Sequence, residues 1–215
     1  MTENVLQYSH KKFLDLLLSG NHLMCSELVE SYLDKKITIN ELYENILKKA
    51  LYDVGELWEY NIISVASEHL ASAIVEAILN EHYHKTVSKN KINKTIILTC
   101  VENEFHQIGI KMVGNVFEMN GWNINFLGAN TPTKDLISFA ETTKPDLLAI
   151  SLSLYFNLPV LENMLQLINK KLPNLKILIG GQAFRHGGQH ILSKYQNTSY
   201  LPDLYSTELF IKNLK

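Results

Sequence analysis

The stretch TIILTCVENEFHQIG, residues 95–109, decides the fold of this chain. Its first part, 95–101, is a short apolar run of the kind that forms a buried strand. Its second part turns polar, carries acids and His106, and ends on Gly109 as a helical pattern begins. A buried strand that runs into a helix is typical of alternating strand–helix units with a parallel sheet. The open question is whether His106 merely lies near a helix start or holds a ligand at the strand's end.

The same alternation continues to the C-terminus. Four more short apolar runs lie at residues 123–128, 146–152, 175–180 and 199–202. Helical patterns lie between and after them, at residues 106–120, 134–143, 158–171, 187–196 and 206–213. This alternation predicts a five-stranded parallel sheet with helices on both faces, in a flavodoxin-like (Rossmann-type) order. Ligands of such sheets bind beyond the carboxyl ends of the strands, which is where His106 is expected.

Before residue 87 the pattern is helical throughout. Apolar residues recur at helical spacing in four segments, and Thr38–Asn40 and Ser64 are expected to begin the third and the fourth. Short connections at 19–21 and 59–63 indicate antiparallel neighbours, and hence a four-helix bundle.

A polar, basic stretch then separates the two halves. Residues 87–94 have no apolar period and are typical of a linker. The sequence therefore predicts an α/β protein with three parts: a helical bundle at 1–86, a linker at 87–94 and a Rossmann-like domain at 95–215.

Composition excludes several classes of function. The chain has 215 residues, of which 46% are hydrophobic and 20% charged, and its net charge is −2 at pH 7. It has no basic block suited to nucleic acid. Cys25 and Cys100 have no metal-type spacing and suggest a reducing compartment. Since the sequence also lacks a signal-peptide pattern and an apolar run long enough to span a bilayer, we expect a cytoplasmic protein without membrane contact.

The residues around His106 favour a ligand over a plain helix start. Glu104 can accept a hydrogen bond from the ring nitrogen that is not used for ligation, which fixes the tautomer and raises the basicity of the ligand. Gly109 lets a bulky group approach the backbone. No glycine-rich dinucleotide loop follows the strand, which argues against a nucleotide cofactor of the usual type.

Two further strand ends carry candidate residues. Ser151 and Ser153 offer hydroxyl groups after the third apolar run, although either could instead cap the helix that begins near Pro159. Gly180 and Gly181 end the fourth run. They leave room for a flat group beside the backbone, or they only make a tight turn.

Together these positions resemble the cobalamin-binding domain shared by methionine synthase, corrinoid methyl-carrier proteins and cobalamin photoreceptors. That family has the pattern DxHxxG, then SxL, then GG, and this chain has Glu104-Phe105-His106-Gln107-Ile108-Gly109, Ser151-Leu152-Ser153 and Gly180-Gly181. The resemblance implies that His106 replaces the cofactor's own dimethylbenzimidazole as lower axial ligand of cobalt. It also implies that the displaced nucleotide tail enters a cleft lined by Gly109, Ser151 and Gly181.

The chain departs from that pattern at two positions. Glu104 stands where the family has Asp and is one methylene longer, which can shift its hydrogen bond to His106. Ser153 stands where Leu is usual, which leaves open which serine meets the tail.

The helical half resembles the cap that covers the upper face of cobalamin in methionine synthase and in the photoreceptors. Its segment WEYNIISVASEH, residues 58–69, resembles the signature of the adenosylcobalamin photoreceptors related to light-dependent transcriptional regulators. The resemblance implies that Trp58 packs against an upper adenosyl group and that Glu68 and His69 hydrogen-bond its ribose or adenine. Alternatively, Trp58 is a core residue and Glu68 only a favourable acid near a helix N-terminus. We expect His82 and His84 to be exposed.

The resemblance implies a sensor rather than an enzyme. Adenosylcobalamin would lie between cap and sheet, and light would change the contacts of the cap. The related regulators usually carry a DNA-binding domain before the cap, whereas here the cap pattern begins almost at Met1. The output is therefore expected through a protein partner or a homo-oligomer, without direct contact to nucleic acid.

Two alternatives remain open. One is a corrinoid methyl carrier of a methyltransferase system, which would hold methylcobalamin. The other is a binding module for another tetrapyrrole, such as haem or a bilin, because His106 could equally ligate haem iron.

Overall fold

A computed structural model describes the backbone of residues 3–214 and the side chains of residues 9–214. Met1, Thr2 and Lys215, at the ends of the two predicted domains, lie outside the described residues. The chain divides into two compact units, residues 1–86 and 87–215.

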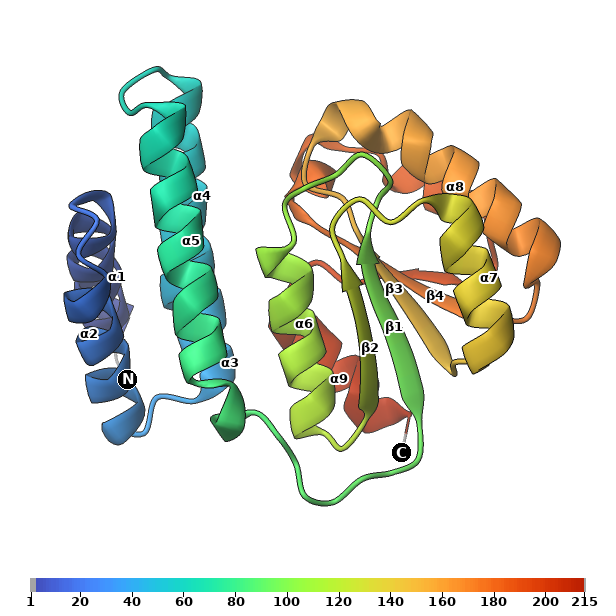
Figure 1. Cartoon of the computed structure of the whole chain (residues 1–215), viewed down its shortest axis with the longest axis horizontal. Coiled ribbons are helices and arrows are strands. Elements are labelled where there is room, and N and C mark those ends of the chain that lie inside the picture. The colour runs from blue at the N-terminus through green and yellow to red at the C-terminus, as the bar shows by residue number, and fades with distance from the viewer. Residues whose placement is uncertain (1–2, 215) are drawn as a thin grey trace. The chain divides into compact units, whose positions relative to one another are not determined.

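The N-terminal unit is helical (Figure 1). Its described part forms four helical rods, namely α1 (Glu3–Leu18), α2 (His22–Asp34), a rod composed of α3 (Ile39–Leu42), the π-helical turn η1 (Tyr43–Leu47) and α4 (Lys48–Glu59), and α5 (Val65–Glu81). The short 3-10 turn η2 (Tyr83–Lys85) follows α5. The predicted four-helix bundle is therefore confirmed.

The predicted helix starts are observed as side-chain caps. The Thr38 hydroxyl accepts a hydrogen bond from the Glu41 N–H, and the Glu41 carboxylate accepts one from the Thr38 N–H. Ser64 begins α5 by accepting a bond from the Ser67 N–H at 3.1 Å. The helices then bury one face each, including Phe13, Leu17, Val29, Tyr43, Ile46, Leu47, Ala50, Val75 and Ile78.

The prediction for His82 is wrong, because its side chain is buried rather than exposed. Only 7% of the residue is accessible, and its Nδ1 lies 3.2 Å from Glu30 Oε2 on α2. His82 follows Ile74 and Ile78 at helical spacing, so it continues the buried face of α5 by one more position. His84, two residues further on, is exposed as predicted.

Residues 87–94 have neither helix nor strand, and hydrogen bonds attach them to the C-terminal unit. The Ile92 N–H donates to the Gly121 carbonyl at 3.0 Å, and Lys91 pairs with the buried Glu118.

The C-terminal unit is built on a parallel sheet. Its strands are β1 (Thr95–Cys100), β2 (Asn123–Gly128), β3 (Leu147–Ser151), β4 (Lys176–Gly180) and β5 (Thr198–Tyr200). Their order is β2-β1-β3-β4-β5, which confirms the flavodoxin-like prediction. Cys100 pairs with Ser151, and Ser151 with Gly180, so the carboxyl ends of the three central strands line up at one edge.

Helices cover both faces of the sheet (Figure 1). The helices α6 (Ile108–Met119) and α9 (Leu204–Asn213) lie on one face, and α7 (Thr133–Thr143) and α8 (Leu158–Lys171) lie on the other. The 3-10 turn η3 (Tyr155–Asn157) leads into α8. Within residues 3–214, no helix combines the length and the hydropathy needed to cross a membrane.

The helix predicted at 187–196 is not an α-helix. The 3-10 segment η5 (Gln189–Lys194) lies within this region, and a second 3-10 segment, η4 (Gln182–His186), precedes it. Between them, Gly187 and Gly188 have φ angles of +108° and +94°. A right-handed helix cannot pass through residues in that conformation.

Candidate functional site

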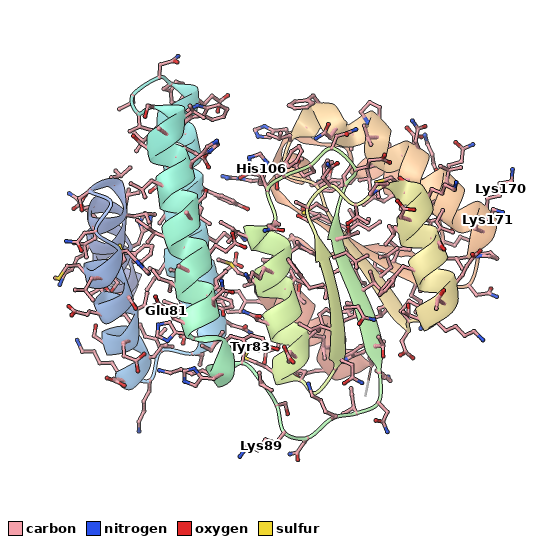
Figure 2. The ribbon with its side chains drawn as sticks, viewed as in Figure 1. Glu81, Tyr83, Lys89, His106, Lys170 and Lys171 are labelled. Atoms are coloured by element: carbon pink, nitrogen blue, oxygen red, sulfur yellow. The ribbon has the colours of Figure 1, made fainter. Side chains whose placement is uncertain are left out.

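His106 lies on the loop that joins β1 to α6, at the carboxyl edge of the sheet (Figure 2). Its side chain is 48% exposed, whereas Glu104, two residues earlier, has no exposed side-chain surface. The Glu104 carboxylate accepts a hydrogen bond from His106 Nδ1. Metal-ligating histidines typically have one ring nitrogen held by a carboxylate in this way, which fixes the ring.

The Glu104 carboxylate has four backbone donors besides the imidazole. Oε1 accepts from the N–H groups of Phe105 and His106 at 3.1 and 3.2 Å. Oε2 accepts from Ser153 and Leu154, in the loop after β3, at 3.2 and 2.9 Å. Burial alone would raise the pKa of Glu104, but the bonds from His106 and Leu154 outweigh it and hold that pKa below 4.5. The carboxylate therefore stays ionised and can act only as an acceptor.

Other side chains of this loop, which the sequence reasoning missed, attach it to the neighbouring loop after β2. Glu102 Oε2 accepts from the N–H and the hydroxyl of Thr133 at 3.2 and 2.7 Å, and so caps the start of α7. Gln107 Oε1 accepts from the Ala129 N–H at 3.1 Å. The loop that carries His106 is thus fixed from both sides.

Two asparagines complete these attachments. The Asn103 N–H donates to Asn130 Oδ1 at 3.0 Å, and the Asn130 N–H donates to the Glu104 carbonyl at 2.9 Å. Both asparagines adopt a left-handed backbone conformation, with φ angles of +69° and +50°. Asparagine tolerates this conformation better than most residues, so its occurrence in both loops was a signal in the sequence.

Ser151 and Ser153 do not cap the following helix. Asn157 is the residue before α8, and the helix begins at Leu158. Ser151 is 5% exposed at the end of β3, and Ser153 is half-buried in the loop beyond it. Both serines therefore lie at the carboxyl edge of the sheet, together with His106.

The glycines of the motif differ in what packing requires of them. Gly181 has a φ angle of +113°, and a Cβ atom there would lie 2.1 Å from the Leu152 carbonyl oxygen, so a tight turn explains this glycine. A Cβ atom at Gly180 would lie 3.0 Å from the Leu201 carbonyl oxygen. At Gly109, a Cβ atom would have no neighbour within 4 Å apart from the backbone of its own helix. Packing within the chain therefore does not require glycine at 109, which leaves open space beside the histidine loop.

Exposed aromatic side chains lie in the loops of the same edge. Phe105 is 69% exposed, and Tyr155 and Phe156, after β3, are 45% and 73% exposed. Large apolar residues grouped at a ligand edge are typical of a surface that packs against a bound group. A partly exposed imidazole held through Nδ1, with open space at Gly109, fits a bulky group that carries a metal.

The candidate residues of the helical unit lie near one end of it. Trp58 is 44% exposed at the end of α4, so the alternative that it is a core residue is wrong. Glu68 and His69 lie near the start of α5, which follows after a short loop. The Glu68 carboxylate lies 2.6 Å from His69 Nδ1 and accepts from Ser72 Oγ at 2.8 Å. The candidate residues therefore fall into two sets, one in each unit.

Known protein families match both units. Residues 94–199 match a family model described as B12 binding domain, and residues 10–81 match a second model of the same description.

Two kinds of curated protein are similar to the chain. The HTH-type transcriptional repressor CarH of Myxococcus xanthus is 28% identical over 144 residues, which are 66% of this chain and 48% of that protein. The repressor CarA of the same organism is 32% identical over 41% of this chain and 31% of its own length. The chain thus spans about half or less of each repressor. Trimethylamine corrinoid protein 1 of Methanosarcina acetivorans is 23% identical over 65% of this chain and 66% of its own length.

The fold is also found among solved structures. The monomethylamine corrinoid protein of Methanosarcina barkeri has a TM-score of 0.83 and 16% identity, and the match covers 97% of this chain and 99% of that one. At this identity the match shows that the two proteins share a fold.

Proposed function

This chain belongs to the family of B12 binding domain proteins, and we propose that it is a light-responsive sensor that holds adenosylcobalamin. It is a cobalamin-binding protein, and the proteins similar to it include both a transcriptional repressor and a trimethylamine corrinoid protein. The main observation in support of a sensor is that Trp58 is exposed at the same end of the helical unit as the paired Glu68 and His69. The similarity to the CarH repressor supports a regulatory role.

His106 is proposed as the lower cobalt ligand. The buried Glu104 would orient the imidazole and keep it basic, because it accepts a hydrogen bond from Nδ1. The nucleotide tail would enter beside Gly109, Ser151 and Gly181, and Ser153 lies next to this route in the loop after β3.

Trp58 is proposed to face the upper side of the cofactor. When bound, adenosylcobalamin supplies a cobalt–carbon bond that light breaks. The Trp58 indole would pack against the adenosyl group, and Glu68 and His69 would hydrogen-bond its sugar or base. Loss of these contacts gives the two states of the helical unit a difference in free energy, which is the requirement for a ligand-driven switch. The signal would pass to a protein partner or to a change in self-association.

The test is to load the full chain with adenosylcobalamin in the dark and then illuminate it. We expect the absorption spectrum to change and the elution volume in size-exclusion chromatography to shift. Protein loaded with hydroxocobalamin, which has no cobalt–carbon bond, and treated in the same way is the control for an effect of illumination alone. Light cleaves the cobalt–carbon bond of adenosylcobalamin whether or not a protein responds to it, so an unchanged elution volume after the spectrum has changed would rule out the sensor.

A second candidate function is a corrinoid carrier that passes methyl groups between methyltransferases. The fold match to the monomethylamine corrinoid protein along nearly the whole chain supports it. This carrier would prefer methylcobalamin, and replacement of Trp58 would hardly change its choice of cofactor. A tighter affinity for methylcobalamin than for adenosylcobalamin would therefore favour the carrier.

A binding module for haem or a bilin is not supported by the family matches. The absorption spectrum of the protein as purified distinguishes such a module from a corrinoid protein, because the three chromophores absorb differently.

A further inference from the structure

The two oxygens of the Glu104 carboxylate bond to two different loops. Oε1 bonds to the imidazole and to the backbone of Phe105 and His106, in the loop after β1. Oε2 bonds to the backbone N–H groups of Ser153 and Leu154, in the loop after β3. One fully buried side chain therefore connects the loop of the proposed cobalt ligand to the loop beside the proposed tail cleft.

The length of the side chain decides whether both loops can be reached. An aspartate, which the family pattern has at this position, is shorter by one methylene, about 1.5 Å. Aspartate commonly bonds to the N–H groups that follow it in its own chain, so it would keep the contacts to Phe105 and His106. It would then fall short of Ser153 and Leu154, since those bonds are already 3.2 and 2.9 Å long with glutamate.

Backbone hydrogen bonds of the sheet join the loops after β1 and β3 only where each loop begins. The last backbone bond between them in the ladder runs from the Val101 N–H to the Ser151 carbonyl at 3.0 Å. Beyond it, Ser153 and Leu154 are held to the histidine loop through Glu104. The carboxylate therefore provides a direct link through which a change in the position of one loop can act on the other.

We propose that Glu104 is a positioning residue that couples the cobalt ligand to the tail side of the corrinoid site. The coupling rests on the proposed role of His106 as lower ligand, but it does not depend on light. Occupation of the tail cleft would fix the loop after β3, and Glu104 would transmit that order to His106. The tail and the histidine would then each bind more tightly when the other is in place.

The experiment measures the coupling directly. The full chain and its His106→Ala variant are titrated in the dark with cobalamin and with cobinamide, a corrinoid that lacks the nucleotide tail. The gain in affinity from the tail is expected to be roughly 10-fold larger with His106 than without it. The absorption spectrum of each complex reports whether the cofactor's own base is detached, and where it is detached in both proteins the cost of detachment cancels from the comparison. The same four titrations are then repeated in the Glu104→Asp background. There, the gain in affinity from the tail should be equal with and without His106.

A matched control comes from the same loop. Glu102→Asp shortens a neighbouring carboxylate that bonds to Thr133 and does not contact Ser153 or Leu154. It should leave the coupling intact. Equal coupling in Glu104→Asp and in the unsubstituted protein would overturn the proposal, as would the absence of coupling in the unsubstituted protein.

A second measurement needs no cofactor. Amide hydrogen exchange in the cofactor-free protein should become faster at Ser153 and Leu154 in Glu104→Asp, and it should stay unchanged at Phe105 and His106. Unchanged exchange at 153 and 154 would contradict the proposed bridge. If the loaded protein fails to respond to light but the coupling is found, the sensor is wrong and the role of Glu104 stands.

Discussion

The two sets of candidate residues differ in how firmly the rest of the chain holds them in place. In the C-terminal unit, Glu104 is fully buried and fixes the His106 ring. In the helical unit, Trp58 is 44% exposed, and the His69 side chain is 75% exposed. Side chains that the chain already holds in place lose little freedom on binding, whereas exposed side chains lose more when a ligand immobilises them. We therefore predict that Glu104 and His106 determine how tightly cobalamin binds. Trp58, Glu68 and His69 should determine which form of the cofactor is preferred.

The largest effect is expected for His106→Ala. Loss of a group that only orients a ligand typically costs about 10–100-fold in metal affinity, so loss of the ligand itself should cost more. The visible spectrum of bound cobalamin should also lose the features of a histidine-ligated cobalt. Titration followed by absorbance measures both effects, and His190→Ala, an exposed histidine of the same unit, is the control. Unchanged affinity and spectrum in His106→Ala would leave this histidine as a plain helix-start residue.

Alanine substitutions at Gly181 and Gly109 distinguish a glycine that is needed for packing within the chain from one that leaves room for a ligand. Alanine at 181 meets the Leu152 carbonyl oxygen and a φ angle of +113°, and it should lower the free energy of unfolding by roughly 2–4 kcal/mol. Alanine at 109 meets nothing within 4 Å inside a helix, so it should leave the stability unchanged or raise it by up to about 0.5 kcal/mol. If Gly109 provides space for the corrin, Gly109→Ala still weakens cobalamin binding.

Urea unfolding and cobalamin titration of both glycine variants separate the two roles. A stable Gly109→Ala protein with undiminished affinity would remove Gly109 from the site.

A smaller effect is expected for Trp58→Ala, because this side chain acts only through the bound ligand. Packing of an aromatic ring contributes about 0.5–1.5 kcal/mol beyond area burial, which corresponds to roughly 2- to 13-fold in affinity. The loss should fall on adenosylcobalamin and spare methylcobalamin. Tyr60→Ala, which truncates another aromatic residue that is 73% exposed, is the matched control. Equal losses for both cofactors would contradict the role of Trp58 in cofactor choice.

The sequence predicted the fold well because its signals were local and strong. Buried parallel strands form continuous apolar runs, as β1 and β3 do, and the bounds of the more exposed edge strand β2 were predicted to the residue. The region 187–196 was misread because its apolar spacing suits a helix, whereas Gly187 and Gly188 adopt positive φ angles. Glycine permits that conformation without requiring it, so the sequence alone could not decide.

The candidate site was predictable in its motif and not in its connections. The spacing of Glu104 and His106 suggested their hydrogen bond. The bonds of Glu104 to Ser153 and Leu154, and of Glu102 to Thr133, join residues that are far apart in the sequence. Such contacts depend on which loops meet at the sheet edge and on the exact length of one side chain, and no local pattern encodes them.

The smallest effect concerns His82, which offers a pH test of the helical unit. Burial lowers the pKa of His82 below 6.5, and Lys85 and His84 add to this, against the opposing influence of Glu30 and Glu81. The unfolded chain therefore binds a proton at a higher pH than the folded unit does. The stability that His82 contributes is fully present above about pH 6.5 and is lost as the pH falls through the lowered pKa. Its buried Nε2 has no hydrogen-bond partner among the described residues, so a proton there would have no acceptor.

Replacing His82 with Asn removes this titration and should flatten the fall in unfolding free energy between pH 7.5 and 5.5, as measured by urea unfolding with far-UV circular dichroism. The exposed His84→Asn variant should keep the fall of the unsubstituted protein, so the difference between the two variants isolates the buried ring from the other histidines. Cobalamin affinity at pH 7.5 should be unchanged in both variants, because His82 belongs to neither set of candidate residues. A His82→Asn protein that loses as much stability on acidification as His84→Asn would show that the buried imidazole is not the group whose protonation weakens the helical unit.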